Sequence, residues 1–340
     1  MAKRRTSKKK TGPILVTGAS GFLGLHLTRV LREAGHDVRT LGRSHSDRLA
    51  ALEVDQHLGS VTDSEAVAKA VDGVDAIYHC AGWVSRDKGE RGAMYRVHID
   101  GTRAVLQAAL DAGVTKVLVV STSGTVGVAD HADFVANEDS PVAWPLVREW
   151  PYYESKAYAE REVQAFVEKG LPVKLARPTL LLGPGDYNGS STGDVVKYLC
   201  GDIKASLPGG MSAVDVRDVA TALPAILEDG EPGVGYLLGA VNCTVREFMV
   251  MLEQASGVRA PAMSLPRPLV DRASGLLKAV SRLKPFGGLE PQTFEMGCHY
   301  WYIDSARATR LGFEPRPIQD TLRDTIEDLR GMQAVPGSPR

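Results

Sequence analysis

The sequence predicts an α/β protein, with a doubly wound parallel (Rossmann) sheet and a smaller C-terminal lobe. Three observations favour this fold. Short apolar strands alternate with long helical segments, a glycine-rich turn joins the first strand to the first helix, and the alternation stops after Arg177, where glycine and proline accumulate. Strands separated by helices pair in parallel because a parallel connection needs a crossover. The ligand crevice of such a sheet lies at the carboxyl ends of its strands.

The elements follow in order along the chain. Apolar runs bounded by turn residues predict strands, and apolar residues at helical spacing predict helices. Asp63 is expected to cap a helix, and Gly35, Gly113 and Gly170 to end three others. The predicted strands span residues 13–17, 37–41, 74–80, 116–120 and 172–176, with a returning strand near 235–238. The predicted helices span residues 23–33, 63–71, 94–112 and 152–168.

Composition excludes several classes of protein. The formal net charge of −1 gives the body of the chain no electrostatic attraction to nucleic acid or an anionic membrane. Residues 1–10 carry six Lys or Arg, which we interpret as a solvated arm rather than a nucleic-acid contact or an address. No apolar secretory segment follows them, and no run of about 18 apolar residues occurs anywhere. We therefore expect a cytoplasmic protein without a membrane span.

The cysteines indicate neither disulfides nor a metal site. They lie far apart and form no CxxC pair, which is typical of reduced thiols in a cytosolic chain of this length. Cys298 precedes His299, but no further ligand follows at metal-binding spacing, so a structural role is favoured. The four cysteines are Cys80, Cys200, Cys243 and Cys298.

The segment TGASGFLG (residues 17–24) predicts a phosphate-binding loop. Gly18 permits a tight turn, Gly21 lets the backbone approach a pyrophosphate, and Gly24 lets the helix lie close to the sheet. The helix N-terminus offers free N–H groups and a positive dipole to the phosphates. A glycine triplet can be only a turn, but its place between the first strand and first helix favours dinucleotide binding. The candidate cofactor-binding residues of this loop are Gly18, Ser20, Gly21, Phe22, Leu23 and Gly24.

The end of the second strand bears on which dinucleotide is bound. An acidic residue there would bind the adenosine ribose hydroxyls and repel a 2′-phosphate. This chain instead has Arg43, which can clamp a phosphate, and Ser44, which can donate a hydrogen bond to it. Although an exposed loop arginine is usually inert, the missing carboxylate and the added cation together favour NADP(H), with NAD(H) as the alternative.

A hydroxyl-bearing strand end and a Tyr–Lys pair predict the catalytic group. The strand at residues 116–120 leads into Ser121, Thr122 and Ser123, and Tyr152 precedes Lys156 by four residues, which places both on one face of a helix. A free phenol has a pKa of about 10, and a nearby ammonium is expected to lower it. Tyr152 would exchange a proton with a carbonyl oxygen, Ser123 would hold that oxygen, and Lys156 would also bind the nicotinamide ribose.

The order of these motifs resembles the extended short-chain dehydrogenase/reductase (NAD-dependent epimerase/dehydratase) superfamily. The similarity runs from about Pro13 to about Pro317 and is greatest to dihydroflavonol reductases, 3β-hydroxysteroid dehydrogenases and hopanoid-associated sugar epimerase-like proteins. The matching segments are TGASGFLG, HCAG, SxS, YxxxK, ARPTLLLGPGD and VDVRDVA.

The resemblance implies further contacts. Cys80, Ala81 and Gly82 would flank the adenine-side ribose and the pyrophosphate, and Pro178 with Leu181 would lie near the nicotinamide. It also implies a homodimer in which the helices at 94–112 and 152–168 meet their symmetry mates. We expect that interface to use apolar residues of both helices, namely Leu106, Leu110, Ala159 and Val163.

The chain departs from the family pattern in places that concern function. Gly59-Ser60 replaces the Gly-Asp that often holds adenine, so that contact is weaker or remade by Ser60 and Val61. His98 replaces an Asn of the fourth helix and could relay protons, although helix packing is favoured. Leu180 follows Arg177-Pro178-Thr179 where sugar-nucleotide members often carry Asn, and Gly124-Thr125 replaces the acidic pair of sugar dehydratases.

These departures favour a relatively apolar substrate over a nucleotide sugar. The leading hypothesis is an NADPH-dependent ketoreductase acting on a small molecule, with Tyr152 as proton donor. The alternatives are an NAD-dependent nucleotide-sugar epimerase or dehydratase and, more remotely, a non-catalytic NADP sensor. Trp144 and Trp150 either wall the substrate site or anchor a loop.

The same reasoning divides the chain into segments. Residues 1–12 are expected to form a disordered basic tail, and residues 13–178, with a returning segment near 213–239, the NAD(P)-binding domain. Residues 179–212 and 240–330 would form the substrate lobe, and residues 331–340 a second disordered tail.

Overall fold

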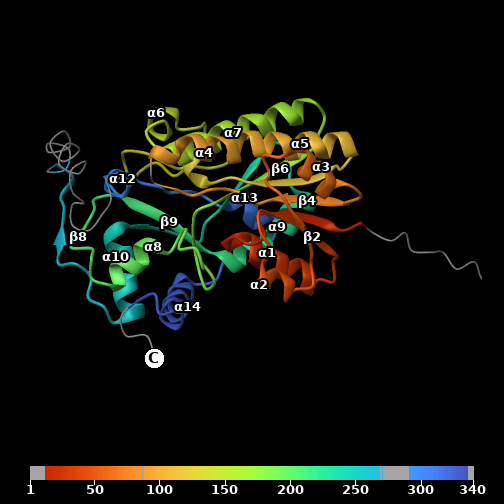
Figure 1. The fold of residues 1–340 in the computed structure, drawn as a ribbon. Coiled ribbons are helices and arrows are strands. Elements are labelled where there is room, and N and C mark those ends of the chain that lie inside the picture. The colour runs from red at the N-terminus through yellow and green to blue at the C-terminus, as the bar shows by residue number, and fades with distance from the viewer. Residues whose placement is uncertain (1–11, 86–87, 269, 271–290, 336–340) are drawn as a thin grey trace, which may run out of the picture.

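A seven-stranded parallel sheet forms the centre of the protein (Figure 1). The structure, a computed structural model, describes residues 12–85, 88–268, 270 and 291–335. The strand order is β10-β6-β5-β4-β1-β2-β3, and every neighbouring pair is parallel, which confirms the predicted fold class. The strands are β1 (Ile14–Thr17), β2 (Val38–Gly42), β3 (Asp55–Leu58), β4 (Ala76–His79), β5 (Lys116–Val120), β6 (Val173–Pro178) and β10 (Gly235–Leu238).

Helices cover both faces of this sheet. Figure 1 shows α3 (Ser64–Val71), α5 (Gly101–Ala112) and α7 (Pro151–Glu168) on one face, with α1 (Phe22–Glu33) and α9 (Val216–Asp229) on the other. Each layer buries its apolar side chains against the strands, in two separate clusters. Asp63 caps α3 through the amides of Glu65 and Ala66, as its position predicts. Gly113 ends α5 in the left-handed conformation, with φ of 70°.

The helix predicted over residues 94–112 is interrupted in its middle. It consists of α4 (Arg91–Tyr95), a π-helical segment η2 (Arg96–Asp100) and α5. A π-helical turn contains one residue more than an α-helical turn. The extra residue changes which side chains face inward, and such turns are frequent at functional sites. Here η2 carries His98, whose side chain is 1% exposed.

The apolar residues expected to form a dimer interface do not face outward. Leu106 and Val163 are 0% exposed and pack in the core between α3, α5, α7 and the sheet, and Ala159 is also buried. Leu110 is half-buried against the same core. Leu106, Ala159 and Val163 therefore offer almost no surface to a partner, and Leu110 offers only part of its side chain.

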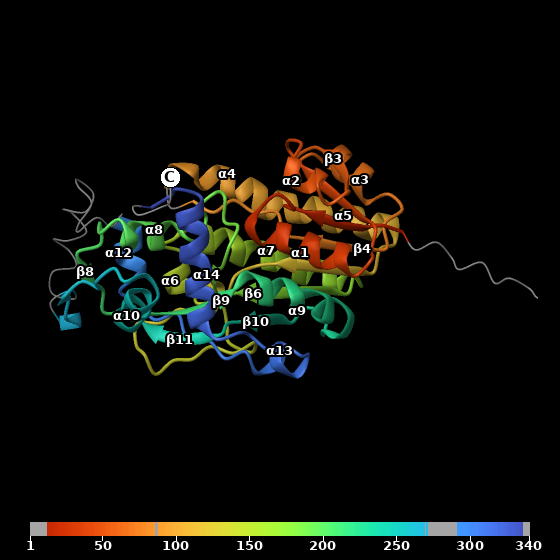
Figure 2. The ribbon, with the colours of Figure 1, turned by 90° about the horizontal axis from the view of Figure 1, so that it is seen from below.

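A second region follows the sheet. Its three-stranded sheet has the order β11-β9-β7, with β9 antiparallel to β11 and parallel to β7. Figure 2 shows α14 (Ile318–Gly331) crossing the middle of the molecule, with α10 (Val245–Ser256) beside it on the side away from α3. The remaining elements are α2 (Asp47–Ala50), α6 (Trp144–Val147), β7 (Leu180–Leu182), α8 (Gly193–Leu199), β8 (Ala205–Ser206), β9 (Gly210–Asp215), β11 (Val241–Thr244), α10 (Val245–Ser256), β12 (Met263–Ser264), α12 (Pro291–Met296), α13 (Ala306–Arg310), α14 (Ile318–Gly331), η1 (Lys88–Glu90) and η3 (Ser123–Thr125).

The segment boundaries differ from the expected ones in two places. β9 extends to Asp215 and pairs within the second sheet, whereas α9 and β10 pack with the main sheet; Val214 of β9 also reaches the core on the α1 side of that sheet. α14 continues to Gly331, and Val335 beyond it is 6% exposed in the core of the second region. The expected tail therefore begins later than residue 331. Residues 1–11 and 336–340, which complete the two expected tails, lie outside the described residues.

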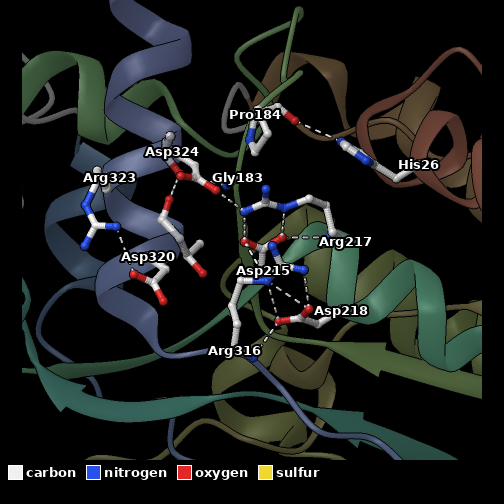
Figure 3. Close-up of polar contacts among 12 residues, drawn as sticks. His26, Gly183, Pro184, Asp215, Arg217, Asp218, Arg316, Asp320, Arg323 and Asp324 are labelled. Carbon is white, nitrogen blue, oxygen red and sulfur yellow. Dashed lines mark hydrogen bonds and ion pairs between the residues drawn. The ribbon is translucent and has the colours of Figure 1, made fainter.

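A charged cluster joins the second region to the main sheet (Figure 3). Arg217, in the first turn of α9, donates to Asp215 at 2.7 Å and to Asp324 of α14 at 2.6 Å. Arg316 donates to Asp218 of α9 at 2.7 Å. Asp215 is fully buried, and the two arginines hold its pKa below the usual range. These ion pairs fix α14 against the start of α9.

The loop after β7 is fixed in the same area (Figure 3). The amide of Gly183 donates to the Thr325 hydroxyl of α14 at 2.8 Å, and His26 of α1 donates to the carbonyl of Pro184 at 2.9 Å. The loop therefore bridges the helix that follows the glycine-rich turn and the C-terminal helix. Among the described residues, we find no helix with the length and apolar character needed to cross a bilayer.

Candidate active site

The glycine-rich turn has the close contacts that its glycines predict. Gly18 has φ of +69°, and a Cβ there would lie 2.6 Å from the Ala81 amide nitrogen. A Cβ at Gly24 would lie 2.2 Å from the Gly18 carbonyl oxygen. Gly21 is the N-cap of α1 and has no side-chain cap, and the first turn contains no acidic residue. The amides of this turn, including those of Phe22 and Leu23, are therefore suited to an anion such as a pyrophosphate.

A buried polar network ties this turn to the end of β4. The Ala81 amide donates to the Thr17 hydroxyl at 3.3 Å, and that hydroxyl contacts His79 Nδ1 at 2.7 Å. His79 Nε2 in turn contacts the Thr102 hydroxyl of α5 at 3.1 Å. Burial and the nearby Lys156 lower the pKa of His79 to about 3, so the imidazole is neutral. The network holds the segment of Cys80, Ala81 and Gly82 beside the glycine-rich turn.

Arg43 and Ser44 lie at the exposed end of β2. The Arg43 guanidinium is 5.4 Å from the ring centroid of Trp83, and the Trp83 indole donates to Glu90 at 3.0 Å. Gln56 of β3 accepts from the Ser46 amide at 2.9 Å and donates to its carbonyl at 3.1 Å, which fixes the loop after β2. A depression beside Ser44 has no acidic lining residue, and its lining consists of Ala19, Ser20, Thr40, Leu41, Gly42, Ser44, Leu49, Gln56 and His57.

Four other candidate cofactor residues have mainly local contacts. The Ser60 hydroxyl is 2.8 Å from that of Thr62, and Val61 is buried against Gly101. Pro178 ends β6 beside Leu238. Leu181 lies in β7 of the second sheet and packs against the core on the α1 side.

Tyr152 and Lys156 project from the first turns of α7 toward the ends of β5 and β4. Lys156 is 8% exposed, and its ammonium donates to the Val120 carbonyl at 2.9 Å. Burial lowers the pKa of Lys156 to about 8. Burial raises the pKa of the Tyr152 phenol to about 12, against a smaller opposing effect of its hydrogen bond with Thr122. The hydroxyl-bearing segment that follows β5 therefore lies beside Tyr152.

The predicted lowering of the Tyr152 pKa by Lys156 is not seen in this structure. The ammonium instead lowers the pKa values of His79 and His98, because it points to the carboxyl end of β4 and is held by the Val120 carbonyl. Lys156 Nζ lies 3.7 Å from the position that a Cβ of Gly82 would occupy. Lys156 thus lies between Tyr152 and residues 80–82, the segment expected to bind the cofactor.

Glu160 is the centre of a buried ion pair that the sequence analysis missed. Its carboxylate accepts two hydrogen bonds from Arg177, at 3.0 and 2.7 Å, and one each from Ser121 at 2.5 Å and Thr125 at 3.1 Å. Both charged side chains are less than a tenth exposed. Glu160 therefore joins α7, the end of β6 and both sides of the segment that carries Ser123. Its place four residues after Lys156 was the one sequence signal that could have identified it.

Aromatic rings lie next to Tyr152. The Tyr153 ring packs against Gly124, where a Cβ would lie 2.1 Å from the ring. Trp301, from the C-terminal third of the chain, stacks on Tyr153 with centroids 4.9 Å apart and planes tilted by 34°. Tyr152 contacts Tyr153 edge-on at 5.1 Å. Gly124, which follows the candidate serine Ser123, is needed because a side chain there would displace Tyr153 and Trp301.

The two tryptophans suggested by the sequence have different positions. Trp150 is 1% exposed and packs against Trp301 at 5.3 Å, which anchors the loop before α7. Trp144 packs on Tyr158, and the Arg161 guanidinium lies 4.2 Å from its ring centroid. Nothing in the sequence around Trp301 predicted that its ring would stack on that of Tyr153. Throughout the described part of the chain, no group of three or more His, Cys, Asp or Glu is placed to hold a metal ion.

Comparisons with known proteins agree with this geometry. Residues 14–239 match the model of the NAD dependent epimerase/dehydratase family. The chain is 33% identical to sterol demethylase protein B of Methylococcus capsulatus, over 93% of this chain and 98% of that protein. It is 29% identical to a 3 beta-hydroxysteroid dehydrogenase/Delta 5-->4-isomerase of Mycobacterium tuberculosis, over 89% and 86%. Among solved structures, gox2253 has a TM-score of 0.83 and 30% identity, over 96% of this chain and 100% of that one.

Proposed function

The chain belongs to the NAD dependent epimerase/dehydratase family, and from this premise we propose that it is an NADPH-dependent ketoreductase for a small, relatively apolar substrate. The family's members are NAD(P)-dependent enzymes of the extended short-chain dehydrogenase/reductase type. The observation that carries the proposal is the group formed by Tyr152, Lys156 and the hydroxyl strand end, with Tyr153 and Trp301 beside it. Stacked aromatic rings beside the tyrosine suit an apolar molecule better than a nucleotide sugar.

In this mechanism the chain's residues manage the proton and the oxygen. NADPH, when bound, supplies the hydride that reduces the carbonyl carbon. The Tyr152 phenol gives its proton to the carbonyl oxygen, so the product is a secondary alcohol and the phenol becomes a phenolate that regains a proton from solvent. Ser123 donates a hydrogen bond to the same oxygen as negative charge develops there. The Lys156 ammonium, held at the Val120 carbonyl, would bind the nicotinamide ribose.

The cofactor would lie along the carboxyl ends of the strands. The turn at Gly18–Gly24 would hold the pyrophosphate on the N-terminus of α1, and Cys80, Ala81 and Gly82 would flank the adenine-side ribose and the pyrophosphate. Ser60 and Val61 would meet the adenine, and Pro178 with Leu181 the nicotinamide. The exposed Arg43 and Ser44 favour a 2′-phosphate, since the depression beside Ser44 is not lined by a carboxylate.

We expect Arg43→Ala to weaken NADPH binding by about tenfold or more, because it removes a charge-assisted hydrogen bond to a phosphate. NADH carries no 2′-phosphate, so its affinity should stay within about twofold of the wild type. Fluorescence titration of both cofactors with both proteins measures this. Arg310→Ala, on the exposed side of α13, makes the same change of net charge far from Arg43 and serves as the control. An equal loss for NADPH and NADH would contradict the assignment of Arg43 to the 2′-phosphate.

Turnover distinguishes the two enzymatic hypotheses. A panel of aryl ketones and fused-ring ketones is incubated with NADPH, and a second panel of nucleotide sugars with NAD. A ketoreductase consumes one NADPH for each alcohol formed, whereas an epimerase returns its cofactor unchanged at the end of each cycle. Ketone-dependent loss of NADPH absorbance supports the proposal. Conversion of a nucleotide sugar without net cofactor consumption would replace it with the epimerase or dehydratase hypothesis. NADP binding without turnover in either panel would favour the sensor hypothesis.

We also propose that the enzyme is a homodimer that uses the outer faces of α4 and α7. Half-buried aromatic side chains gather there, with Tyr95 6.1 Å from Tyr158 and Trp144 5.3 Å from Tyr158. Light scattering at micromolar concentration should give twice the mass of the chain, and Arg161→Glu should shift it toward the monomer, because it places a carboxylate against the Trp144 ring. A monomer mass for the wild type would refute the dimer.

A further inference from the structure

We propose that His98 is a positioning residue that links the backbone of the cofactor segment to the catalytic tyrosine, and that it does not relay protons. The inference rests on the proposed function, since it assigns roles to Trp83 and Tyr152 within the same site. Its basis is a continuous chain of hydrogen bonds through the interior. The Trp83 amide meets His98 Nε2 at 3.0 Å, His98 Nδ1 meets the Ser155 hydroxyl at 2.8 Å, and that hydroxyl meets the Tyr152 carbonyl at 2.8 Å.

The direction of each hydrogen bond follows from the two backbone groups at the ends of this chain, the Trp83 amide and the Tyr152 carbonyl. A backbone amide can only donate, so His98 Nε2 must accept and carries no proton. A backbone carbonyl can only accept, so the Ser155 hydroxyl donates to Tyr152 and therefore accepts from His98 Nδ1–H. The imidazole is thus a neutral ring with its proton on Nδ1, and both of its nitrogens are committed. A ring in this state has no site free to take up or release a proton.

The surroundings of the ring keep it neutral. His98 is 1% exposed, and its pKa lies well below the usual value because of burial first, and then the positive charge of Lys156 and the neighbouring His79. A Cβ at Gly82 would lie 3.3 Å from His98 Nε2, so the glycine lets the backbone of the cofactor segment approach the imidazole. The π-helical turn η2 places the histidine at this point.

The ring also contacts the catalytic tyrosine directly. The His98 and Tyr152 ring centroids are 5.7 Å apart, and the planes are nearly perpendicular at 77°. Ser155 fixes the backbone of Tyr152, and the imidazole fixes its ring. A displacement of the Trp83 segment would therefore reach the backbone of Tyr152 through three hydrogen bonds, and its ring through one hydrogen bond and one packing contact. We infer that His98 aligns the reacting tyrosine with the backbone that flanks the cofactor.

Two substitutions at His98 separate its two hydrogen bonds. Asn places an amide nitrogen near the position of Nδ1 and keeps the donor to Ser155, whereas Gln places an amide oxygen near Nε2 and keeps the acceptor for Trp83. Both remove the ring, so a comparison of the two variants cancels the loss of its contact with Tyr152. Ser155→Ala keeps the ring and the Trp83 contact, and removes the hydroxyl that joins His98 Nδ1 to the Tyr152 carbonyl.

His98→Asn should weaken NADPH binding about tenfold relative to His98→Gln, because it leaves the part-buried Trp83 amide without its acceptor. His98→Gln should lower kcat about tenfold relative to His98→Asn, and Ser155→Ala should lower kcat similarly at unchanged NADPH affinity. NADPH fluorescence titration and turnover of the best ketone from the panel measure the two quantities. Thermal melting of each variant shows that it is folded.

The outcomes separate this inference from the proposed function. Equal changes in NADPH affinity for the Asn and Gln variants, or wild-type kcat for Ser155→Ala, would overturn the positioning role. NMR of 15N-histidine protein should show the Nδ1–H tautomer at neutral pH, and a protonated or Nε2–H ring would overturn it independently. If the wild type reduces no ketone, the proposed function fails, but the NADPH titrations and the tautomer still decide the role of His98.

Discussion

Tyr152→Phe is expected to lower turnover of a ketone by about 10²–10⁴-fold while the fold and NADPH affinity are retained. The change removes one oxygen and keeps the ring that contacts His98 and Tyr153. Without the phenol, the carbonyl oxygen receives no proton as the hydride arrives. Steady-state rates on the best ketone from the panel, with NADPH titration beside them, measure the effect. Near-normal turnover by the variant would rule out Tyr152 as the proton donor.

Two further measurements accompany this substitution. Tyr236→Phe removes the same oxygen in β10, where the hydroxyl accepts from the Glu231 amide. This variant should keep kcat within about threefold of the wild type, because substitutions far from the site usually have small effects.

The pH dependence of the rate should follow the ionisation of the Tyr152 phenol. Reduction needs the protonated phenol. The rate of reduction should therefore be retained below the pKa of the phenol and should fall as pH rises toward that pKa, which is about 12. Alcohol oxidation needs the phenolate and should increase with pH.

Glu160→Gln is expected to reduce the free energy of unfolding by about 3–5 kcal/mol, because it leaves the buried Arg177 charge without its carboxylate. The same change also disturbs the hydrogen bonds from Ser121 and Thr125 on either side of Ser123. Urea denaturation followed by circular dichroism gives the stability. A loss below about 1 kcal/mol, the range of a surface ion pair, would show that the buried pair does not stabilise the fold.

A matched substitution tests whether burial is the cause. Glu228 pairs with Lys116 at 2.6 Å, but both side chains are about half exposed. Glu228→Gln should therefore cost less than about 1 kcal/mol. The double substitution of Glu160→Leu with Arg177→Leu removes both charges, and should be more stable than Glu160→Gln, because an apolar pair leaves no unpaired charge in the interior. A double variant less stable than the single one would point to the hydroxyl contacts as the main contribution.

The local patterns of the sequence were sufficient for the fold and for the candidate catalytic group. The glycine spacing at residues 18–24 determines a turn in which a side chain would clash with the Ala81 amide or the Gly18 carbonyl. The Tyr152–Lys156 spacing places both on one face of α7 because helical neighbours lie three and four residues apart. Alternating strands and helices require crossovers, and so require the parallel sheet. Each of these inferences depends on residues close together in the chain.

Only the tertiary structure decided which distant residues meet. Trp301 reaches Gly124 and Tyr153, which lie far from it in the sequence, and the Glu160–Arg177 pair depends on how α7 lies on β6. Leu106 and Val163 have a helical apolar pattern that suits a core and an interface equally well, and packing against the sheet placed them in the core. His98 fits either a relay or a packing role until the Trp83 amide and the Ser155 hydroxyl occupy its two nitrogens. Burial and hydrogen-bond pairing are properties of the assembled chain, because they depend on neighbours that sequence spacing does not specify.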